Sequence, residues 1–139
     1  MTMESQAVKE RTILEIALAA EVPDVKALLS PVFGVSEDQV VDLRSGDAGE
    51  PAVRYDVEAL PGSFPTKLTV YVDPDRAHGV TTDDALAKAL VAATNDRAVT
   101  SLPPDHPKAE IPTAWMLYRP GQFPRIVHEK PRDDDGIDV

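Results

Sequence analysis

The histidines are the first side chains to consider for chemistry, because imidazole titrates near neutral pH and serves as a general base or a metal ligand. In the segment DPDRAHG, Asp73, Asp75 and His78 are close enough in sequence to share a metal ion or a proton. Aspartate and proline in such a segment more commonly form a turn, in which carboxylate oxygens accept hydrogen bonds from nearby amides. We therefore expect a turn here.

The other two histidines have no convincing catalytic partner. His106 and Glu110 are four residues apart, but Pro107 between them excludes the helix that would bring them together. His128 falls in an expected strand, where the next residue, Glu129, faces the opposite side. The sequence predicts no catalytic centre, no cofactor and no metal site.

The acidic run Asp133, Asp134, Asp135 and Gly136 invites comparison with a calcium-binding loop. An EF-hand loop needs oxygen ligands at positions one, three and five, a glycine at six and a glutamate at twelve. With Gly136 at position six, position one is Pro131 and position twelve lies past the end of the sequence. The run is therefore interpreted as a solvated acidic end with almost no apolar residue to bury, or as an arm for a basic partner.

The charge of the whole chain favours a basic or neutral partner. Twenty-four acidic residues against fourteen basic ones give a formal charge of −10, which argues against direct binding to nucleic acid. The same charge also serves solubility alone. Trp115, the single tryptophan, is an anchor either for the core or for an interface. The candidate partner-binding residues are Asp73, Asp75, Asp83, Asp84, Trp115, Asp133, Asp134 and Asp135.

Length and composition indicate one domain over residues 1–139, with flexible ends at residues 1–10 and 131–139. The absence of cysteine excludes disulfides, cysteine-ligated zinc and thiol catalysis. No segment has the roughly 18 apolar residues of a membrane helix, and no signal peptide is evident. We expect a cytoplasmic protein without a membrane partner.

Apolar periodicity predicts the elements. ILEIALA is expected to be a strand. Pro23 and Asp24 are expected to start a helix that Pro31 loosens or ends and Gly34 stops. QVVDL resembles a strand, and VRYDVEAL and TKLTVYVD alternate as an antiparallel hairpin should.

The second half predicts a second helix from about Asp83 to Asn95, with Thr81 or Thr82 as its cap and a core stripe of Leu86, Leu90 and Ala93. A short strand around AVTSL and a hairpin from AWMLYRPG and FPRIVHE follow. The expected fold is α+β, a two-layer sandwich in which a mainly antiparallel sheet carries two helices on one face. The expected order is ferredoxin-like, β-α-β-β-α-β, with an added C-terminal hairpin.

The stretches FPTKLTVYVDPDR, DDALAKALVAATNDRAVTS and PTAWMLYRPGQFPRIVHEKPRDDDG together resemble small acidic immunity proteins of bacterial polymorphic-toxin and contact-dependent growth inhibition systems. The likeness is one of pattern and covers roughly residues 64 to 136. In that family a late helix leads to a short strand, a strand with tryptophan, a Pro-Gly turn and an acidic end. The family shares no catalytic residues, so none is carried over to this chain.

The resemblance implies a cytoplasmic protein that binds a cognate toxin, for example a basic nuclease domain, and blocks its active or substrate-binding surface. Acidic charge would speed that encounter. One alternative is a small enzyme or ligand-binding protein with a pocket between helices and sheet that contains His78 or His128. Another is an assembly subunit of a phage or a secretion apparatus.

Overall fold

The computed structural model describes residues 11–45, 50–77, 79–134 and 136–139. Within these ranges the chain has an α+β fold, with seven strands in one mostly antiparallel sheet and two α-helices. In chain order the elements are β1 (Thr12–Leu18), α2 (Val25–Phe33), η1 (Glu37–Gln39), β2 (Val40–Asp42), η2 (Leu43–Ser45), β3 (Val53–Ala59), β4 (Thr66–Val72), α3 (Asp83–Thr94), β5 (Ala98–Thr100), β6 (Ala114–Tyr118) and β7 (Arg125–His128). The strand order across the sheet is β2-β3-β4-β1-β5-β6-β7.

Strands β3, β4 and β1 form the middle of the sheet, and all three pair antiparallel. Their residues alternate because successive side chains of a strand point to opposite faces. On β4, Leu68, Val70 and Val72 are buried, while Lys67 and Thr69 on the other face are only partly covered. The hairpin expected from the alternation of VRYDVEAL and TKLTVYVD is confirmed.

Helix α2 begins after Asp24, whose carboxylate accepts a hydrogen bond from the amide of Ala27 at 3.1 Å. Pro23 was expected at the first helical position but precedes the cap. Pro31 lies inside the helix, which continues to Phe33. Gly34 then ends it with a φ of 67°, a left-handed conformation that glycine adopts without strain.

Helix α3 is capped by Thr82, whose hydroxyl accepts a hydrogen bond from the amide of Ala85 at 3.1 Å. Leu86 and Leu90 are buried as expected. Ala93 is exposed, however, and Val91 takes its place in the core, so the expected stripe is wrong at that position. The reason is that α3 packs on β1 and β5 with the side that also presents Ala87.

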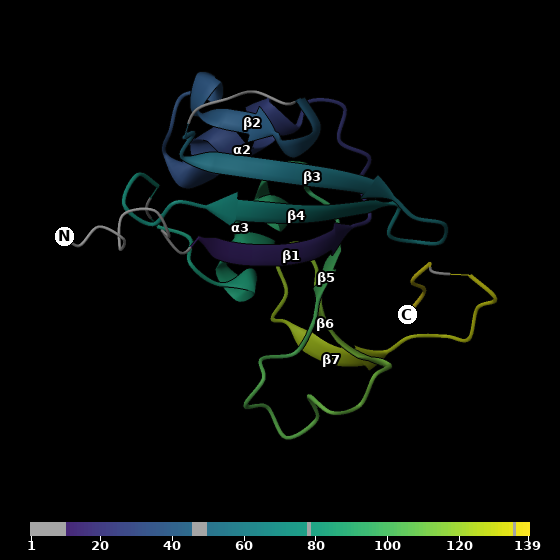
Figure 1. Cartoon of the computed structure of the whole chain (residues 1–139). Coiled ribbons are helices and arrows are strands. Elements are labelled where there is room, and N and C mark those ends of the chain that lie inside the picture. Colours follow the sequence, from purple (N-terminus) through teal and green to yellow (C-terminus); the bar gives the residue numbers. More distant parts are fainter. Residues whose placement is uncertain (1–10, 46–49, 78, 135) are drawn as a thin grey trace.

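Both helices lie on the same side of the sheet and contact each other (Figure 1). The main hydrophobic cluster joins them to the inner face of the central strands. The ferredoxin-like order expected from the sequence is not matched. The short strand β2 enters between α2 and β3, pairs parallel to β3 and becomes one edge of the sheet.

The opposite face of the sheet carries a second, smaller hydrophobic cluster. Its buried members are Ala17, Phe64, Val99, Leu117 and Ile137. The last of these belongs to the C-terminal segment, residues 130–139, which returns to the loop between β3 and β4 and forms a bridge from Ile137 to Gly62. None of the helices in the described part of the chain is both long and apolar enough to cross a membrane.

Candidate functional site

Asp73 has a structural role in the turn after β4. It is only 2% exposed, and one carboxylate oxygen accepts a hydrogen bond from the amide of Asp75 at 3.0 Å. The guanidinium of Arg76 lies 3.8 Å from the other oxygen. The turn expected from the segment DPDRAHG is thus present, and a carboxylate as buried as that of Asp73 does not face a partner. His78 lies outside the described residues.

Asp83 and Asp84 also make contacts within the protein. Asp83 accepts a hydrogen bond from the amide of Glu15 at 3.1 Å, and partial burial raises the pKa of Asp83. Asp84 accepts hydrogen bonds from the Tyr118 hydroxyl at 2.8 Å and from the Lys88 ammonium at 3.0 Å. Burial alone would raise the pKa of Asp84, but these two contacts outweigh it and lower the pKa.

The predicted acidic residues do not meet in one cluster. Val72, which precedes the turn of Asp73, pairs with Thr12 at one end of β1. The C-terminal segment docks near Ser63, in the loop at the other end of β4. Figure 1 shows these two regions at opposite ends of the central strands. Asp133 is exposed, and Asp135 lies outside the described residues.

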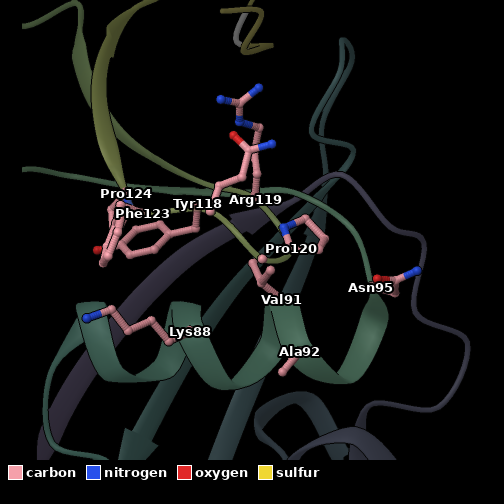
Figure 2. A pocket seen from close by; sticks show the side chains of 11 residues that line it. Lys88, Val91, Ala92, Asn95, Tyr118, Arg119, Pro120, Phe123 and Pro124 are labelled. Atoms are coloured by element: carbon pink, nitrogen blue, oxygen red, sulfur yellow. The ribbon is translucent and has the colours of Figure 1, made fainter.

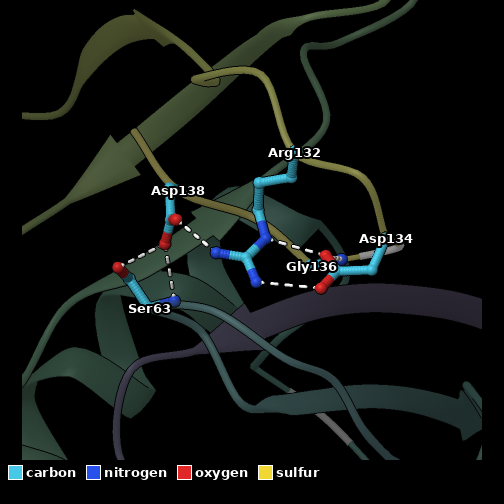
Figure 3. A network of polar contacts seen from close by, with 5 residues as sticks. All are labelled: Ser63, Arg132, Asp134, Gly136 and Asp138. Atoms are coloured by element: carbon cyan, nitrogen blue, oxygen red, sulfur yellow. Dashed lines mark hydrogen bonds and ion pairs between the residues drawn. The ribbon is translucent and has the colours of Figure 1, made fainter.

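Arg132 organises the C-terminal segment (Figure 3). Its guanidinium donates from Nε to Asp134 Oδ1 at 2.8 Å, from Nη2 to Asp134 Oδ2 at 3.0 Å and from Nη1 to Asp138 at 2.5 Å. Asp138 in turn accepts hydrogen bonds from the amide and the hydroxyl of Ser63, at 2.8 and 2.6 Å. We call this set of contacts among Ser63, Arg132, Asp134 and Asp138 the Arg132 clasp.

The clasp holds its carboxylates in the charged form. Hydrogen bonds from Ser63 and Arg132 lower the pKa of Asp138 to about 2. The contact with Arg132 likewise lowers the pKa of Asp134. The segment was expected to be a solvated arm with almost nothing to bury. This expectation needs correction, because Ile137 is 7% exposed and both Asp134 and Asp138 are bound to Arg132.

Trp115 lines a cleft between the open face of the sheet and the C-terminal segment. The cleft has a volume of about 520 Å³ and is bounded on its outer side by Pro131, Arg132 and Asp134. The indole Nε1 donates a hydrogen bond to Glu129 at 3.3 Å, and the ring packs against the second hydrophobic cluster. Of the predicted partner-binding residues that the structure describes, Trp115 and Asp134 both line this cleft.

A second groove, of about 560 Å³, lies between α3 and the turn that joins β6 to β7 (Figure 2). Val91 of the helix points toward Pro120 of the turn, and Lys88 lies on the side of Pro124. Phe123 at its rim is 92% exposed. No sequence pattern indicated this groove, because an aromatic residue beside a proline in a turn looks the same in the sequence whether its ring is covered or exposed.

An acidic edge that the sequence analysis did not single out lies beside β2. Residues 21–42 contain five carboxylates and one lysine. The five are Glu21, Asp24, Glu37, Asp38 and Asp42, and we call them the acidic edge. Helix α2 packs on η1 and β2, so the elements that carry or flank these residues lie at the β2 end of the sheet order (Figure 1).

The acidic edge forms no ion pair among the described residues, although Asp24 and Asp42 accept hydrogen bonds from backbone amides. In the part of the chain that the structure describes, no lysine or arginine lies within 4.0 Å of any of its carboxylates, whereas Arg44 pairs with Asp56 instead, at 2.7 Å. The pKa of Tyr55 is raised, mainly by burial. The negative charges of Asp42 and Asp24 raise this pKa further. The sequence does contain a local excess of acidic residues here, but it is not evident from the net charge of the whole chain.

No group of three or more histidine, cysteine, aspartate or glutamate side chains within the described ranges is arranged to hold a metal ion. Comparisons with protein-family models, with curated proteins and with solved structures find no match for the chain.

Proposed function

We propose that this chain is an immunity protein, a cytoplasmic binding protein that neutralises a basic toxin domain by covering its active or substrate-binding surface. The observation that carries the proposal is the acidic edge, with its five carboxylates and no cation paired to them among the described residues. The pattern-level resemblance of residues 64 to 136 to toxin-immunity proteins points the same way.

The physical basis of the proposal is electrostatic. A patch of one sign steers an oppositely charged partner into encounter and disfavours partners of the same sign. A basic nuclease domain carries positive charge where it binds phosphate, so an acidic surface laid over that site would compete with the nucleic acid. We infer a two-layer sandwich as the scaffold, since the sheet and its two helices hold β2 and η1 rigidly in place.

The proposal is tested by growth protection. Each reading frame adjacent to this gene is expressed in a bacterial host with and without the protein, and the frame that is toxic alone and harmless in its presence identifies the partner. We expect the two proteins to co-purify as a complex, with an association rate that falls as salt is added. If no adjacent product is toxic or binds the protein, the proposal is wrong.

A pair of triple variants assigns the surface. Neutralising Glu37, Asp38 and Asp42 as E37Q, D38N and D42N should slow association at low salt by about tenfold, since charges at the rim of an interface act mainly on encounter. The matched control D96N, D105N and E110Q removes three charges elsewhere. Equal association rates for the two variants would exclude the acidic edge as the contact.

A further inference from the structure

The cleft at Trp115 adjoins a smaller cavity on the same face of the sheet. This inner cavity has a volume of about 100 Å³ and shares Lys67, Trp115 and Ile137 with the outer cleft of about 520 Å³. We treat the two as one site, bounded by the charged side chains under the C-terminal segment and by the surface of the sheet.

Strand register shows what forms the floor of this site. Lys67 of β4 is the partner of Ala17 on β1, which is the partner of Val99 on β5. Residues that are partners in register point to the same face of the sheet. Lys67, Ala17 and Val99 therefore form a row across this face, with one charged side chain followed by two apolar ones. Ala17 and Val99 belong to the second hydrophobic cluster and line the inner cavity, together with Glu15, Thr100 and Ser101. The floor can therefore contact an apolar group about the size of an amino-acid side chain.

The charged end of the site contains an acid and a base on neighbouring strands, and Lys130 lines it as well. Glu58 of β3 is the register partner of Lys67, which puts their Cα atoms about 5 Å apart. Both line the outer cleft, yet no ion pair joins them, and no described residue takes the place of either partner. By contrast, Arg132 and Asp134 in the wall satisfy each other, and Glu129 accepts a hydrogen bond from the indole.

We propose that this cleft binds a small zwitterion with an apolar body, of the chemistry of an amino acid with an apolar side chain. An amino acid carries its carboxylate and its ammonium on one carbon, a spacing that suits a lysine and a glutamate on neighbouring strands. The carboxylate meets Lys67, the ammonium meets Glu58, and the side chain lies over Ala17 and Val99 toward Trp115. This site is separate from the acidic edge and does not depend on the proposed function.

The test uses the full-length protein and the fluorescence of Trp115, the only tryptophan in the chain. L-phenylalanine is titrated first, followed by phenylpropionate, which lacks the ammonium, and phenethylamine, which lacks the carboxylate. We expect saturable binding of L-phenylalanine, and binding of each analogue that is about tenfold weaker because one charge-assisted contact is lost. Calorimetry gives the same constants without a fluorophore.

Two variants assign the charges. Lys67→Met should weaken binding of L-phenylalanine and phenylpropionate about tenfold and leave phenethylamine unchanged, and Glu58→Gln should show the reverse preference. Lys108→Met, which removes an exposed lysine of the loop before β6, is the control and should bind as the parent protein does. Thermal unfolding of each variant verifies that the fold is retained.

The outcomes are decisive in both directions. Absence of saturable binding of both L-phenylalanine and L-leucine at millimolar concentration overturns the proposal. Equal affinity for the zwitterion and its two analogues, unchanged in Lys67→Met and Glu58→Gln, also overturns it, because it shows adventitious contact with an apolar surface only. Opposite preferences of the two variants for the two analogues confirm the site.

Discussion

At the scale of single residues, Arg132 decides where the acidic end of the chain lies. One guanidinium binds two carboxylates, and one of these also accepts two hydrogen bonds from Ser63. A planar guanidinium with several donors suits this role, and a lysine could not replace it with the same geometry. The clasp is exposed to solvent, and exposed ion pairs add little to the free energy of unfolding. Its main effect is therefore to fix the position of the C-terminal segment.

Gly136 allows the C-terminal segment to approach the loop before Phe64. A Cβ added at Gly136 would lie 2.3 Å from the carbonyl oxygen of Pro61, which belongs to the backbone and cannot rotate away. We therefore expect Gly136→Ala to detach the segment, expose Ile137 and lower the melting temperature by a few degrees while the sheet persists. The measurement is thermal unfolding together with Trp115 fluorescence.

The control for this change is Asp133→Ala in the same segment. Asp133 is exposed, and no hydrogen bond or ion pair joins it to the described residues, so its loss should alter neither signal. If Gly136→Ala behaves like Asp133→Ala, the segment does not make the close approach described for it.

The clasp should also depend on pH. The folded pKa of Asp138 is about 2, below its usual 3.8, so the contribution of this carboxylate is fully present above about pH 4. It is lost as the pH falls from about 4 through about 2, and the lowered pKa of Asp134 adds to the same loss. We expect a change in Trp115 fluorescence over this window.

Asp138→Asn should abolish most of that change, because the variant has no carboxylate to protonate at the clasp. Asp133→Asn should keep the profile of the parent protein. A profile that is identical in the parent protein and in Asp138→Asn would show that the acid transition comes from another group.

At the scale of elements, α3 ties the two halves of the chain together. It packs on β1 from the first half and on β5 and β6 from the second, and it contacts α2. Its cap at Thr82 and its buried leucines are both encoded locally. The hairpin β6–β7 joins the sheet through β5, and α3 packs across that junction.

Leu90 measures the contribution of this packing. Its side chain is fully buried, so Leu90→Ala should lower the free energy of unfolding by about 2 to 5 kcal/mol through lost apolar contact and the cavity left behind. Chemical denaturation gives the value. Ile13→Ala, at a position that is 58% exposed, should change it by less than about 0.5 kcal/mol. Similar losses in both variants would contradict the assignment of α3 to the core.

At the scale of the whole molecule, the charge is unevenly distributed. The acidic edge lies toward β2, whereas residues 83–130, which include α3 and the strands β5 to β7, contain six basic and six acidic residues. The two ends of the sheet order therefore differ in net charge. A partner with a basic surface is expected to approach from the β2 side, where the field is negative.

Removal of residues 133–139 tests how the C-terminal segment acts in the whole molecule. The sequence suggested that folding would hardly change, but the structure predicts a loss of about 1.5 to 3 kcal/mol from the burial of Ile137. Chemical denaturation of the truncated protein measures the loss. Unchanged stability would return the segment to the role of a solvated end.

The sequence by itself determined the local elements. Alternation in VRYDVEAL and TKLTVYVD predicted the hairpin, and the threonine before Asp83 predicted the start of α3. These features depend on neighbours along the chain, because strand alternation and helix capping are satisfied within a few residues. The sequence also indicated the class of fold. A strand of three residues such as β2, however, is too short for its residue pattern to predict its place in the strand order of the sheet.

Only the tertiary structure decided which charges are free. Asp73, Asp84 and Asp134 look alike in the sequence, yet one is buried in a turn, one accepts a hydrogen bond from a tyrosine and one is held by Arg132. The residues that bind these carboxylates are between two and thirty-four positions away in the sequence. A carboxylate acts on a partner only if its charge is not already satisfied, and that depends on contacts between distant segments. For the same reason the acidic edge and the cleft at Trp115 emerged from the packing of elements and not from any motif.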